Sequence, residues 1–570
     1  MSAKPKTAKS APASGPAPRS GSRDANGSQL GAILTATALM AIAGVASTVS
    51  QLGLSPVYGS IPAAIWHQKS LMFIALIVLI NKSVFKRLFP ANIHVWIPVV
   101  AFWIQPIQSI LFQYSSKLGP VYGPVVTEAL TFYPFLLLCM YSAVSALEVL
   151  DLSLFSRGFA EGIPPLACYT TFSTVEKFVA GALPAFMGSN EFFTRSGLQL
   201  FVAAFSAAVA PSKFLLLALP ALFHTVRLNP HFPSTTTTAV LNETLQANQY
   251  TLLERQESLT GYVSVIESHQ NQFRLLRCDH SLLGGEWLVT PQRAAGGQKE
   301  KETIYTVFTM LEAVRLVITG SVNNQRKDSQ KSALNIGLGI GTAPTALLKH
   351  GINTTIVELD PAVHHMATKY FDLPTNHTAI LRDAVAYVSE TAVTAPASFD
   401  YIIHDVFTGG AEPAALFTLD FMQGLKTLLR QDGVVAINYA GDLRLDSTRL
   451  VLNTIHAVFP SCRIFRDQAK EESGQPDEMD FINMILFCRP VKKALINFRQ
   501  PTDADFLGSI VRKRTLYPQK ELEVAFTPDE GAQLLTDETI EVLEKGHQES
   551  AVSHWGIMRT VLPDRIWELW

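Results

Sequence analysis

The segment 334–342 constrains the fold of this chain more than any other. It reads Leu-Asn-Ile-Gly-Leu-Gly-Ile-Gly-Thr, and after a helical stretch comes a second apolar run that ends in an acid. This order predicts a strand, a glycine turn, a helix and a second strand. Gly337, Gly339 and Gly341 would let the backbone turn sharply and approach a ligand closely. Glu358 lies about 20 residues beyond the turn, where an acid can accept hydrogen bonds from two ribose hydroxyls.

Strands and helices alternate through the rest of the C-terminal half. Strands are expected at 333–337, 354–358, 378–381, 400–404, 433–437, 462–466 and 481–488, and helices at 343–350, 361–370, 418–430 and 447–459. This alternation predicts a doubly wound α/β domain, in which ligands bind at the carboxyl ends of parallel strands. Asp383 and Asp405 follow the third and fourth strands. With Glu358 at the ribose, they would face the adenine amine and the group on the 5′ carbon of a bound nucleoside.

Four further segments complete the expected organisation of this half. Alternating, turn-rich sequence predicts a small β-hairpin lid, and a Pro/Thr-rich stretch before it reads as a linker. The last part of the chain looks helical and amphipathic. The expected limits are 227–251 for the linker, 252–295 for the lid, 296–495 for the nucleoside-binding domain and 496–570 for the helical extension.

The N-terminal half has a different composition. The mean hydropathy of the chain is +0.20 and only 16% of its residues are charged, because residues 31–226 are apolar and poor in charge. Six apolar segments reach the roughly 20 residues that a membrane-spanning helix needs. The number of spans is six, or seven if Pro211-Ser-Lys213 makes the last segment a helical hairpin. The six segments lie near 31–50, 61–81, 94–115, 124–147, 163–187 and 197–225.

Basic residues predict the orientation of these spans. Residues 1–30 form a basic tail that we expect to be disordered, and Lys82, Lys86 and Arg87 follow the second span. The N-terminus is therefore expected in the cytosol. Six spans would place the catalytic domain in the cytosol too, and this is the interpretation that we favour. The chain is then a multi-pass membrane protein, of which the sequence does not identify the organelle. Seven spans would place the domain in the lumen or outside, where the sequons at Asn242, Asn353 and Asn376 would matter.

Two bulk properties bear on partners and redox state. The net charge is −2 and there is no basic stripe, so binding to nucleic acid is not expected. The lipid bilayer is the expected partner of the apolar half. The five cysteines have no spacing that suggests a zinc site or a CxxC pair, and we expect buried, reduced thiols and no metal.

The C-terminal half resembles the spermidine/spermine synthase family of polyamine aminopropyltransferases over about 255–490. That family has the class I methyltransferase-type fold, and the chain is most similar to members that carry the domain behind a multi-span membrane region. The segments that carry the resemblance are Asp279-His-Ser-Leu-Leu-Gly-Gly285, Tyr305, Ile336-Gly-Leu-Gly-Ile-Gly341, Val357-Glu-Leu-Asp-Pro361, Lys369-Tyr-Phe371, Arg382-Asp-Ala384, Phe399-Asp-Tyr-Ile-Ile-His-Asp405, Leu416-Phe417 and Asp432-Gly-Val434.

The resemblance implies a role for each of these site residues. Glu358 would bind the ribose, and Asp383 the adenine, of decarboxylated S-adenosylmethionine. Asp405 would be the catalytic acid/base, taking a proton from a small-molecule amine before the amine attacks. Tyr305 would line the amine pocket. Family members also form dimers, so the resemblance implies that a homodimer can form.

The chain departs from the family where a polyamine would bind. The family's glycine turn usually contains an Asp that binds the aminopropyl amine, and here that residue is Ile340. Thr306-Val307 stands where His-Glu usually follows the tyrosine, and Val406-Phe-Thr-Gly-Gly410 replaces an Asp-Pro-x-Gly-Pro run. The expected Gln of the first lid strand is Gly261. Loss of each such polar contact costs about 1–3 kcal/mol.

Three functions remain open from the sequence. The favoured one is a membrane-anchored aminopropyltransferase of polyamine biosynthesis. The second is an S-adenosylmethionine-dependent methyltransferase, because Ile340 would not repel the carboxylate of intact S-adenosylmethionine; Asn335 and Thr342 are candidates to receive that carboxylate. The third is a non-catalytic nucleoside or polyamine sensor that controls the membrane region.

Overall fold

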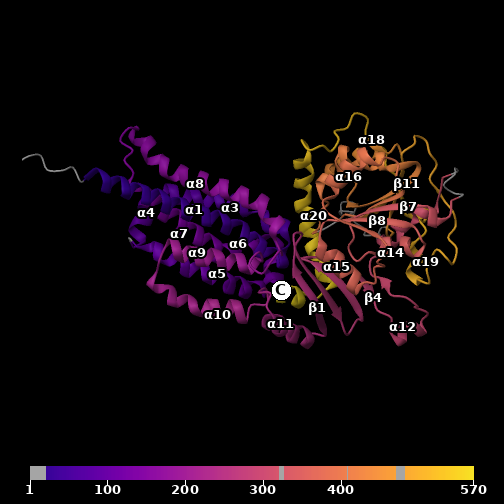
Figure 1. Ribbon diagram of the computed structural model, residues 1–570, viewed down its shortest axis with the longest axis horizontal. Helices are drawn as coiled ribbons and strands as arrows, with labels where there is room; N and C mark the ends of the chain where they lie inside the picture. The colour runs from indigo at the N-terminus through magenta and orange to yellow at the C-terminus, as the bar shows by residue number, and fades with distance from the viewer. Residues whose placement is uncertain (1–20, 91, 320–325, 407–408, 470–481) are drawn as a thin grey trace, which may run out of the picture.

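The protein consists of an N-terminal helical bundle and a C-terminal α/β part (Figure 1). The computed structural model describes residues 21–90, 92–319, 326–406, 409–469 and 482–570. The last long helix, α20 (Ile540–Val561), lies between the two parts. Residues 1–20 of the basic tail fall outside the described residues, whereas residues 21–30, expected to be disordered with them, form the start of α1 (Gly21–Tyr58).

The bundle is built of long helices that run side by side. Four stretches, 28–58, 60–78, 93–112 and 132–149, are long and apolar enough to cross a bilayer. The helices are α1 (Gly21–Tyr58), α2 (Ser60–Ala64), α3 (His67–Ile80), α4 (Lys82–Leu88), α5 (Ile97–Phe112), α6 (Ser115–Leu130), α7 (Phe132–Ala146), α8 (Arg157–Ala182), α9 (Arg195–Val209) and α10 (Leu219–Arg227).

The last expected span is two antiparallel helices, α9 and α10. The backbone breaks between them at 210–212, where Pro211 cannot donate a helical hydrogen bond. α9 begins with Arg195, whose guanidinium lies 2.8 Å from Glu257 at the end of the bundle that faces the C-terminal half. The break lies at the other end, where Phe214 stacks on Trp96. We call these the proximal and distal ends.

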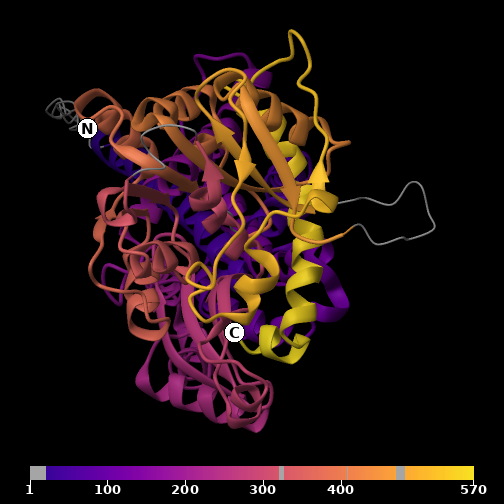
Figure 2. The same ribbon diagram turned by 90° about the vertical axis from the view of Figure 1, so that its right-hand side faces the viewer.

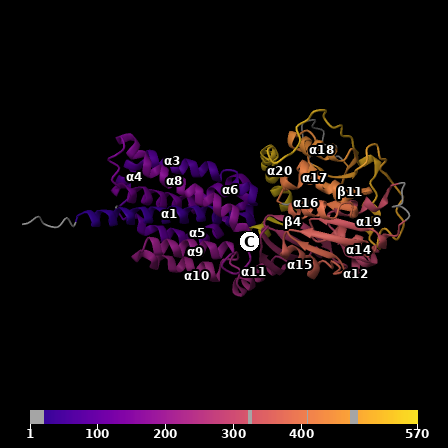
Figure 3. The ribbon, with the colours of Figure 1, turned by 45° about the horizontal axis from the view of Figure 1, so that its top comes forward.

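The chain therefore passes along the bundle seven times within the described residues. α1 ends at the proximal end, where the carbonyl oxygen of Val57 accepts a hydrogen bond from Trp555. α3 and α7 both end at the distal end, where Lys82 pairs with Glu148 at 2.8 Å. An odd number of passes separates the start of α1 from the C-terminal half, which lie at opposite ends of the bundle in Figure 3. The sequence left open six or seven membrane spans; the bundle has seven passes, and which of them cross a membrane stays a prediction.

A buried polar cluster joins the bundle helices. The His67 ring lies 2.8 Å from Glu128, and its other nitrogen is 2.7 Å from the Ser47 hydroxyl. Ser47 in turn donates to Glu176 at 2.6 Å. Buried charged groups are stable only when they are paired and hydrogen-bonded, so this cluster ties α1, α3, α6 and α8 together.

The lid is larger than the expected hairpin. It is an antiparallel sheet in the order β1-β2-β3-β4-β5. An isolated hairpin is marginally stable, whereas several strands with an apolar face support one another. The expected linker contains α11 (Thr235–Ala247), which begins at a Ser234 cap and packs on β1. The strands are β1 (Tyr250–Glu257), β2 (Tyr262–Ser268), β3 (Phe273–Cys278), β4 (Ser281–Trp287) and β5 (Glu302–Thr303).

The core sheet has the order β15-β12-β13-β11-β10-β7-β8-β9. β7 to β11 are parallel, as the sequence predicts, and β12, β13 and β15 pair antiparallel. The strand order reverses between β7 and β10, which is where such sheets bind ligands. The strands are β7 (Ser332–Ile336), β8 (Asn353–Glu358), β9 (Thr378–Leu381), β10 (Phe399–His404), β11 (Leu429–Gly441), β12 (Ser461–Arg466), β13 (Ile482–Arg489) and β15 (Glu523–Val524).

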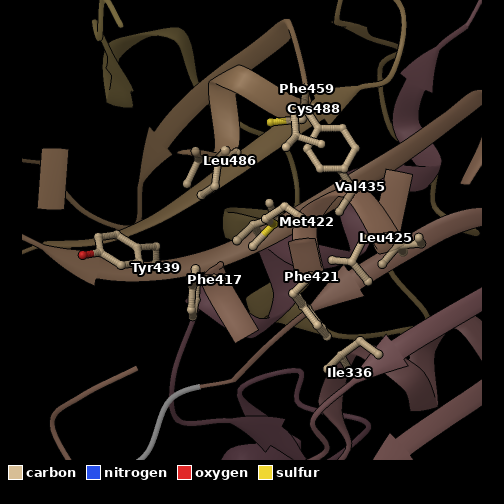
Figure 4. Packing of buried hydrophobic residues seen from close by; sticks show 14 of the residues in the cluster. Ile336, Phe417, Phe421, Met422, Leu425, Val435, Tyr439, Phe459, Leu486 and Cys488 are labelled. Atoms are coloured by element: carbon tan, nitrogen blue, oxygen red, sulfur yellow. The ribbon is translucent and has the colours of Figure 1, made fainter. Parts of the chain in front are cut away.

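Helices cover the sheet, and Figure 2 shows it from the end of the molecule opposite the bundle. Phe421, Met422 and Leu425 of α17 pack on Val435 of β11 and Leu486 of β13, all buried (Figure 4). A two-stranded sheet pairs β6 (Val317–Ile318) with β14 (Asn497–Phe498). The helices are α12 (Pro291–Ala295), α13 (Val307–Leu311), α14 (Thr342–Lys349), α15 (Pro361–Tyr370), α16 (Ala384–Thr394), α17 (Leu419–Leu428) and α18 (Asp446–Val458).

The expectation of reduced thiols is wrong for two cysteines. Cys462 of β12 and Cys488 of β13 form a disulfide, because they lie directly opposite each other in the antiparallel ladder with Cα atoms 4.1 Å apart. Cys139, Cys168 and Cys278 are free and buried. The pair is separated by 26 residues in sequence, so only strand pairing brings it together.

The C-terminal extension is only partly helical. It contains α19 (Ile510–Thr515), β15, α20 and α21 (Asp564–Leu569). Trp567 and Trp570 are fully buried, and each ring lies 4.5 Å from the guanidinium of Arg277. Arg277 also donates to the carbonyl oxygen of Pro56 at 2.7 Å. The end of the chain is thus fixed at the junction of the lid and the bundle.

Candidate active site

A cavity of about 730 Å³ lies at the carboxyl ends of the parallel strands. Six of the seven predicted site residues line it. They are Gly337, Gly339, Glu358, Asp383, Asp405 and Tyr305. Gly341 does not line it and instead precedes α14 in a left-handed conformation, with φ of 81°. The cavity volume is within the usual range for a small-molecule site.

The glycine turn brings two strand ends together. Gly337 has a positive φ of 81°, and a Cβ atom there would collide with the carbonyl oxygen of Asp405. The backbone of Asp405 also donates to the carbonyl oxygen of Ile336 at 3.0 Å. Glycine at 337 therefore permits the close approach of β7 and β10 that places Asp405 beside the turn.

Glu358 ends β8 inside the cavity. It is only 8% exposed, and its carboxylate accepts a hydrogen bond from the backbone N–H of Asp360 at 2.8 Å. Burial raises the pKa of Glu358 to about 7. The structure thus holds a carboxylate where the ribose hydroxyls of a nucleoside can donate to it.

Asp383 has a structural role in addition to its place in the cavity. It is the N-cap of α16, and its carboxylate accepts from the backbone N–H groups of Val385 and Ala386 at 3.2 and 3.3 Å. The side chain is exposed toward the cavity. A capping carboxylate is held in one orientation, which suits contact with an adenine amine.

Asp405 lies at the end of β10 beside Asn438 of β11. The Asn438 amide donates to Oδ1 of Asp405 at 2.9 Å, while Oδ1 of Asn438 is buried and has no hydrogen-bond partner among the described residues. Burial raises the pKa of Asp405 to about 6, and the amide bond opposes this rise. The hydroxyl of Tyr305 is also buried, meets no partner in the part of the chain that the structure describes, and has a pKa that burial raises. These groups can bind N–H groups of an acceptor.

Two positions where the resemblance leads us to expect polar groups carry the apolar residues Ile340 and Val307. Ile340 is 5% exposed, does not line the cavity and packs toward Gly284 of β4. Val307 and Phe308 line the cavity after Tyr305. The turn therefore presents no carboxylate to the group attached to the nucleoside.

The two sequence candidates for a carboxylate contact lie outside the cavity. Asn335 is 1% exposed and its amide donates to the carbonyl oxygen of Gly337. Thr342 begins α14 and does not line the cavity.

The sequence did not reveal how α20 takes part in the site. His554, Ile557 and Met558 of this helix line the cavity, more than 140 residues beyond Asp405. Their spacing of i, i+3, i+4 is a signal of one helical face. The sequence shows this face but not what it meets.

Acidic groups outnumber basic ones around the cavity. The described lining contains Glu358, Asp383, Asp405 and Asp467, against Arg466. His554 adds no charge near neutral pH, because burial lowers its pKa to about 4. The cavity therefore favours cationic ligands, such as a sulfonium or an ammonium group.

Comparison with known proteins gives a domain match and full-length similarity. Residues 312–466 match the spermine/spermidine synthase domain. The chain is 28% identical to a polyamine aminopropyltransferase of Vibrio vulnificus over 300 residues, covering 51% of this chain and 90% of that protein. A probable spermidine synthase from Corynebacterium glutamicum has a solved structure that covers 48% of this chain and 97% of its own, with 17% identity and a TM-score of 0.35.

One relative spans nearly the whole chain, bundle included. The N-terminal histidine N-methyltransferase of Emericella nidulans is 44% identical over 554 residues, which is 94% of this chain and 97% of that protein. Similarity of this extent includes the helical bundle, the lid, the core sheet and the C-terminal extension together. The chain therefore belongs to the family of the Emericella nidulans N-terminal histidine N-methyltransferase.

Proposed function

We propose that this protein is an S-adenosylmethionine-dependent methyltransferase that methylates the N-terminal histidine of a polypeptide. The observation that carries the proposal is the similarity along the full length to an N-terminal histidine N-methyltransferase. The cavity supports it, because Glu358 and Asp383 suit a nucleoside and the acidic lining suits a sulfonium.

Aminopropyl transfer, our first expectation from the sequence, is less well supported. The donor of that reaction carries a cationic aminopropyl amine beside its sulfonium, and the resemblance implies that the family binds this amine with an Asp in the glycine turn. Ile340 occupies the position here and is turned into the lid. An apolar residue neither attracts that amine nor repels the carboxylate of intact S-adenosylmethionine.

The residues around Asp405 can assist methyl transfer. S-adenosylmethionine supplies the methyl group on a sulfonium. An acceptor nitrogen uses its lone pair to attack the methyl carbon as the carbon–sulfur bond breaks, and S-adenosylhomocysteine leaves. Asp405 and Oδ1 of Asn438 would orient the acceptor's N–H groups, and the ionised Asp405 would take the proton that the nitrogen gives up.

The test uses the full-length chain in detergent micelles. A peptide that begins with His is incubated with S-adenosylmethionine, beside the same peptide N-acetylated and a peptide that begins with Ala. Mass spectrometry should show one methyl group on the first peptide only. Putrescine with decarboxylated S-adenosylmethionine forms a separate arm. Product in that arm and none with the peptides would overturn the proposal in favour of aminopropyl transfer.

We further propose that the bundle spans a membrane and that the catalytic part faces the lumen or the outside, not the cytosol. Seven passes put the start of α1 and the catalytic part on opposite sides. Lys82, Lys86 and Arg87 lie at the distal end, which the positive-inside rule assigns to the cytosol. The Cys462–Cys488 disulfide also suits an oxidising compartment.

Glycosylation tests this orientation. Asn376 is exposed within a sequon, whereas the amide of Asn242 is engaged with the backbone of Leu252 at 3.0 and 3.2 Å. Peptide-N-glycosidase F should shift the mobility of the protein purified from a eukaryotic host, and Asn376→Gln should remove part of that shift. A glycan-free chain whose catalytic part is cleaved by protease added to the cytosolic side of sealed vesicles would refute the orientation.

A further inference from the structure

α20 has two functional faces, one on the bundle and one on the cavity. Trp555 donates from its indole to the carbonyl oxygen of Val57 at 3.1 Å, and Arg559 donates to the Ser115 hydroxyl at 2.9 Å. These residues are four apart and share the face toward the proximal end of the bundle. The bundle thus fixes the position of the helix from outside the cavity.

The same helix packs on the loop that follows Asp405. Gly410 has a φ of 86°, and a Cβ atom on it would lie 2.6 Å from Cβ of His554 and 2.7 Å from Cα of Ala551. Ser550 also donates to the carbonyl oxygen of Gly410 at 2.5 Å. The glycine that replaces the family's proline in this loop is therefore needed for α20 to lie this close.

A neighbouring face of α20 is turned to the cavity. His554, Ile557 and Met558 line it, and Ile557 is 50% exposed although it is a large apolar residue. Leu282 and Leu416 line the cavity as well, from β4 and from the turn Ala414–Phe417. The acids that suit the nucleoside, Glu358 and Asp383, come from other strand ends.

This face matches the chemistry of a polypeptide's first side chains. Apolar side chains can pack on a ring or an aliphatic side chain, and the Met558 thioether makes favourable contacts with aromatic rings. Ser281 lies 3.2 Å from Nε2 of His554, which fixes the ring at the edge of this surface.

We propose that His554, Ile557 and Met558 form the acceptor subsite, which binds the first residues of the polypeptide, and that the bundle positions this subsite through Trp555 and Arg559. The inference rests on the proposed function and extends it. α20 then determines which acceptor enters, while the strand ends hold the nucleoside.

The test compares three variants of the full-length chain in detergent micelles. Ile557→Ala removes apolar surface from the subsite. Gly410→Ala forces α20 away from the loop. Gly556→Ala is the matched control, because Gly556 lies on the same helix and a Cβ atom there would meet no atom within 4 Å. KM and kcat are measured for a peptide that begins with His, and the Kd for S-adenosylmethionine is measured by calorimetry.

We expect Ile557→Ala to raise the peptide KM about tenfold, the effect of one lost apolar contact. Gly410→Ala should raise it further, and both should leave the cofactor Kd within about twofold of wild type. Gly556→Ala should match wild type. Loss of cofactor affinity in Ile557→Ala, or a KM equal to that of Gly556→Ala, overturns the inference. A wild-type chain that methylates no such peptide overturns the proposed function itself.

Discussion

The side-chain amide of Asn438 donates a 2.9 Å hydrogen bond to Oδ1 of Asp405, across the neighbouring strands β11 and β10. Desolvation alone would favour the protonated acid, and the amide stabilises the carboxylate against it. The pair therefore holds Asp405 near the pKa of a general base that works at neutral pH, with the other carboxylate oxygen available to an acceptor.

The pH dependence of activity should follow this pair. The carboxylate is active when ionised, so kcat/KM should rise with pH through about 6. Asn438→Ala removes the donor, raises the pKa of Asp405 and should move this limb to higher pH. The acceptor's own titration is the same in both enzymes, so the difference between the two profiles reports Asp405. Superimposable profiles would show that the Asn438 amide does not alter the pKa of Asp405.

Asp405→Asn should separate activity from stability. Loss of the base should lower kcat about 10²–10⁴-fold. In the folded wild type the pKa of Asp405 lies above its ordinary value of 3.8. Ionisation of this carboxyl group therefore lowers the stability of the fold as the pH rises from about 4 to 6. At pH 7 the free energy of unfolding of the variant should be about 1–3 kcal/mol higher than that of the wild type, so the variant should melt at a higher temperature. Thermal melts at pH 4 and 7 check the sign, since the difference should shrink at pH 4.

Glu358 should make cofactor binding depend on pH. Its pKa is raised to about 7, and a protonated acid offers one acceptor fewer to the ribose hydroxyls. The affinity for S-adenosylmethionine should increase from pH 6 to pH 8 in the wild type. Glu358→Gln should bind about 10–100 times more weakly, through the loss of charge-assisted hydrogen bonds, and should show no such increase. Calorimetric titration at three pH values measures both effects.

The Cys462–Cys488 disulfide should stabilise the catalytic part. A double Cys→Ser variant should lose about 2–4 kcal/mol of unfolding free energy, since an unlinked chain gains conformational freedom when it unfolds. A reducing agent should lower the melting temperature of the wild type and leave that of the variant unchanged. Peptide mapping without reduction should recover the linked pair; two free thiols in the protein from its native membrane would contradict the pairing.

The polar cluster of the bundle should be sensitive to loss of its histidine. His67→Ala leaves Glu128 and Glu176 buried without their shared partner, which should cost about 3–5 kcal/mol. Lys69→Ala is the control, because Lys69 is exposed nearby and only approaches the Trp66 ring. The melting temperature of the solubilised protein should fall steeply for His67→Ala and not for Lys69→Ala. Equal melting of the two would show that the cluster is not needed for stability.

Much of the nucleoside half of the site could be predicted from local sequence. The glycine turn and the acids at 358, 383 and 405 follow from the alternation of strands and helices, because parallel strands bring their carboxyl ends to one edge. Gly341 has the positive φ of the predicted sharp turn but precedes α14 and does not line the cavity, so its part in ligand binding stays a prediction. In a turn of three glycines, the backbone path decides which of them faces the ligand.

The sequence alone determined the two-part organisation, the parallel core strands and the strand-end acids that line the cavity, since these depend on hydrophobic periodicity and on glycine's access to positive φ. Tertiary structure decided the rest. The disulfide, the seventh pass and the contact of His554 with Gly410 join segments through packing that no local period encodes. Strand register brought the two cysteines of the disulfide together. The break at Pro211, with the packing of α9 and α10 on α5, made the seventh pass. The position of α20 between bundle and sheet placed His554 against Gly410.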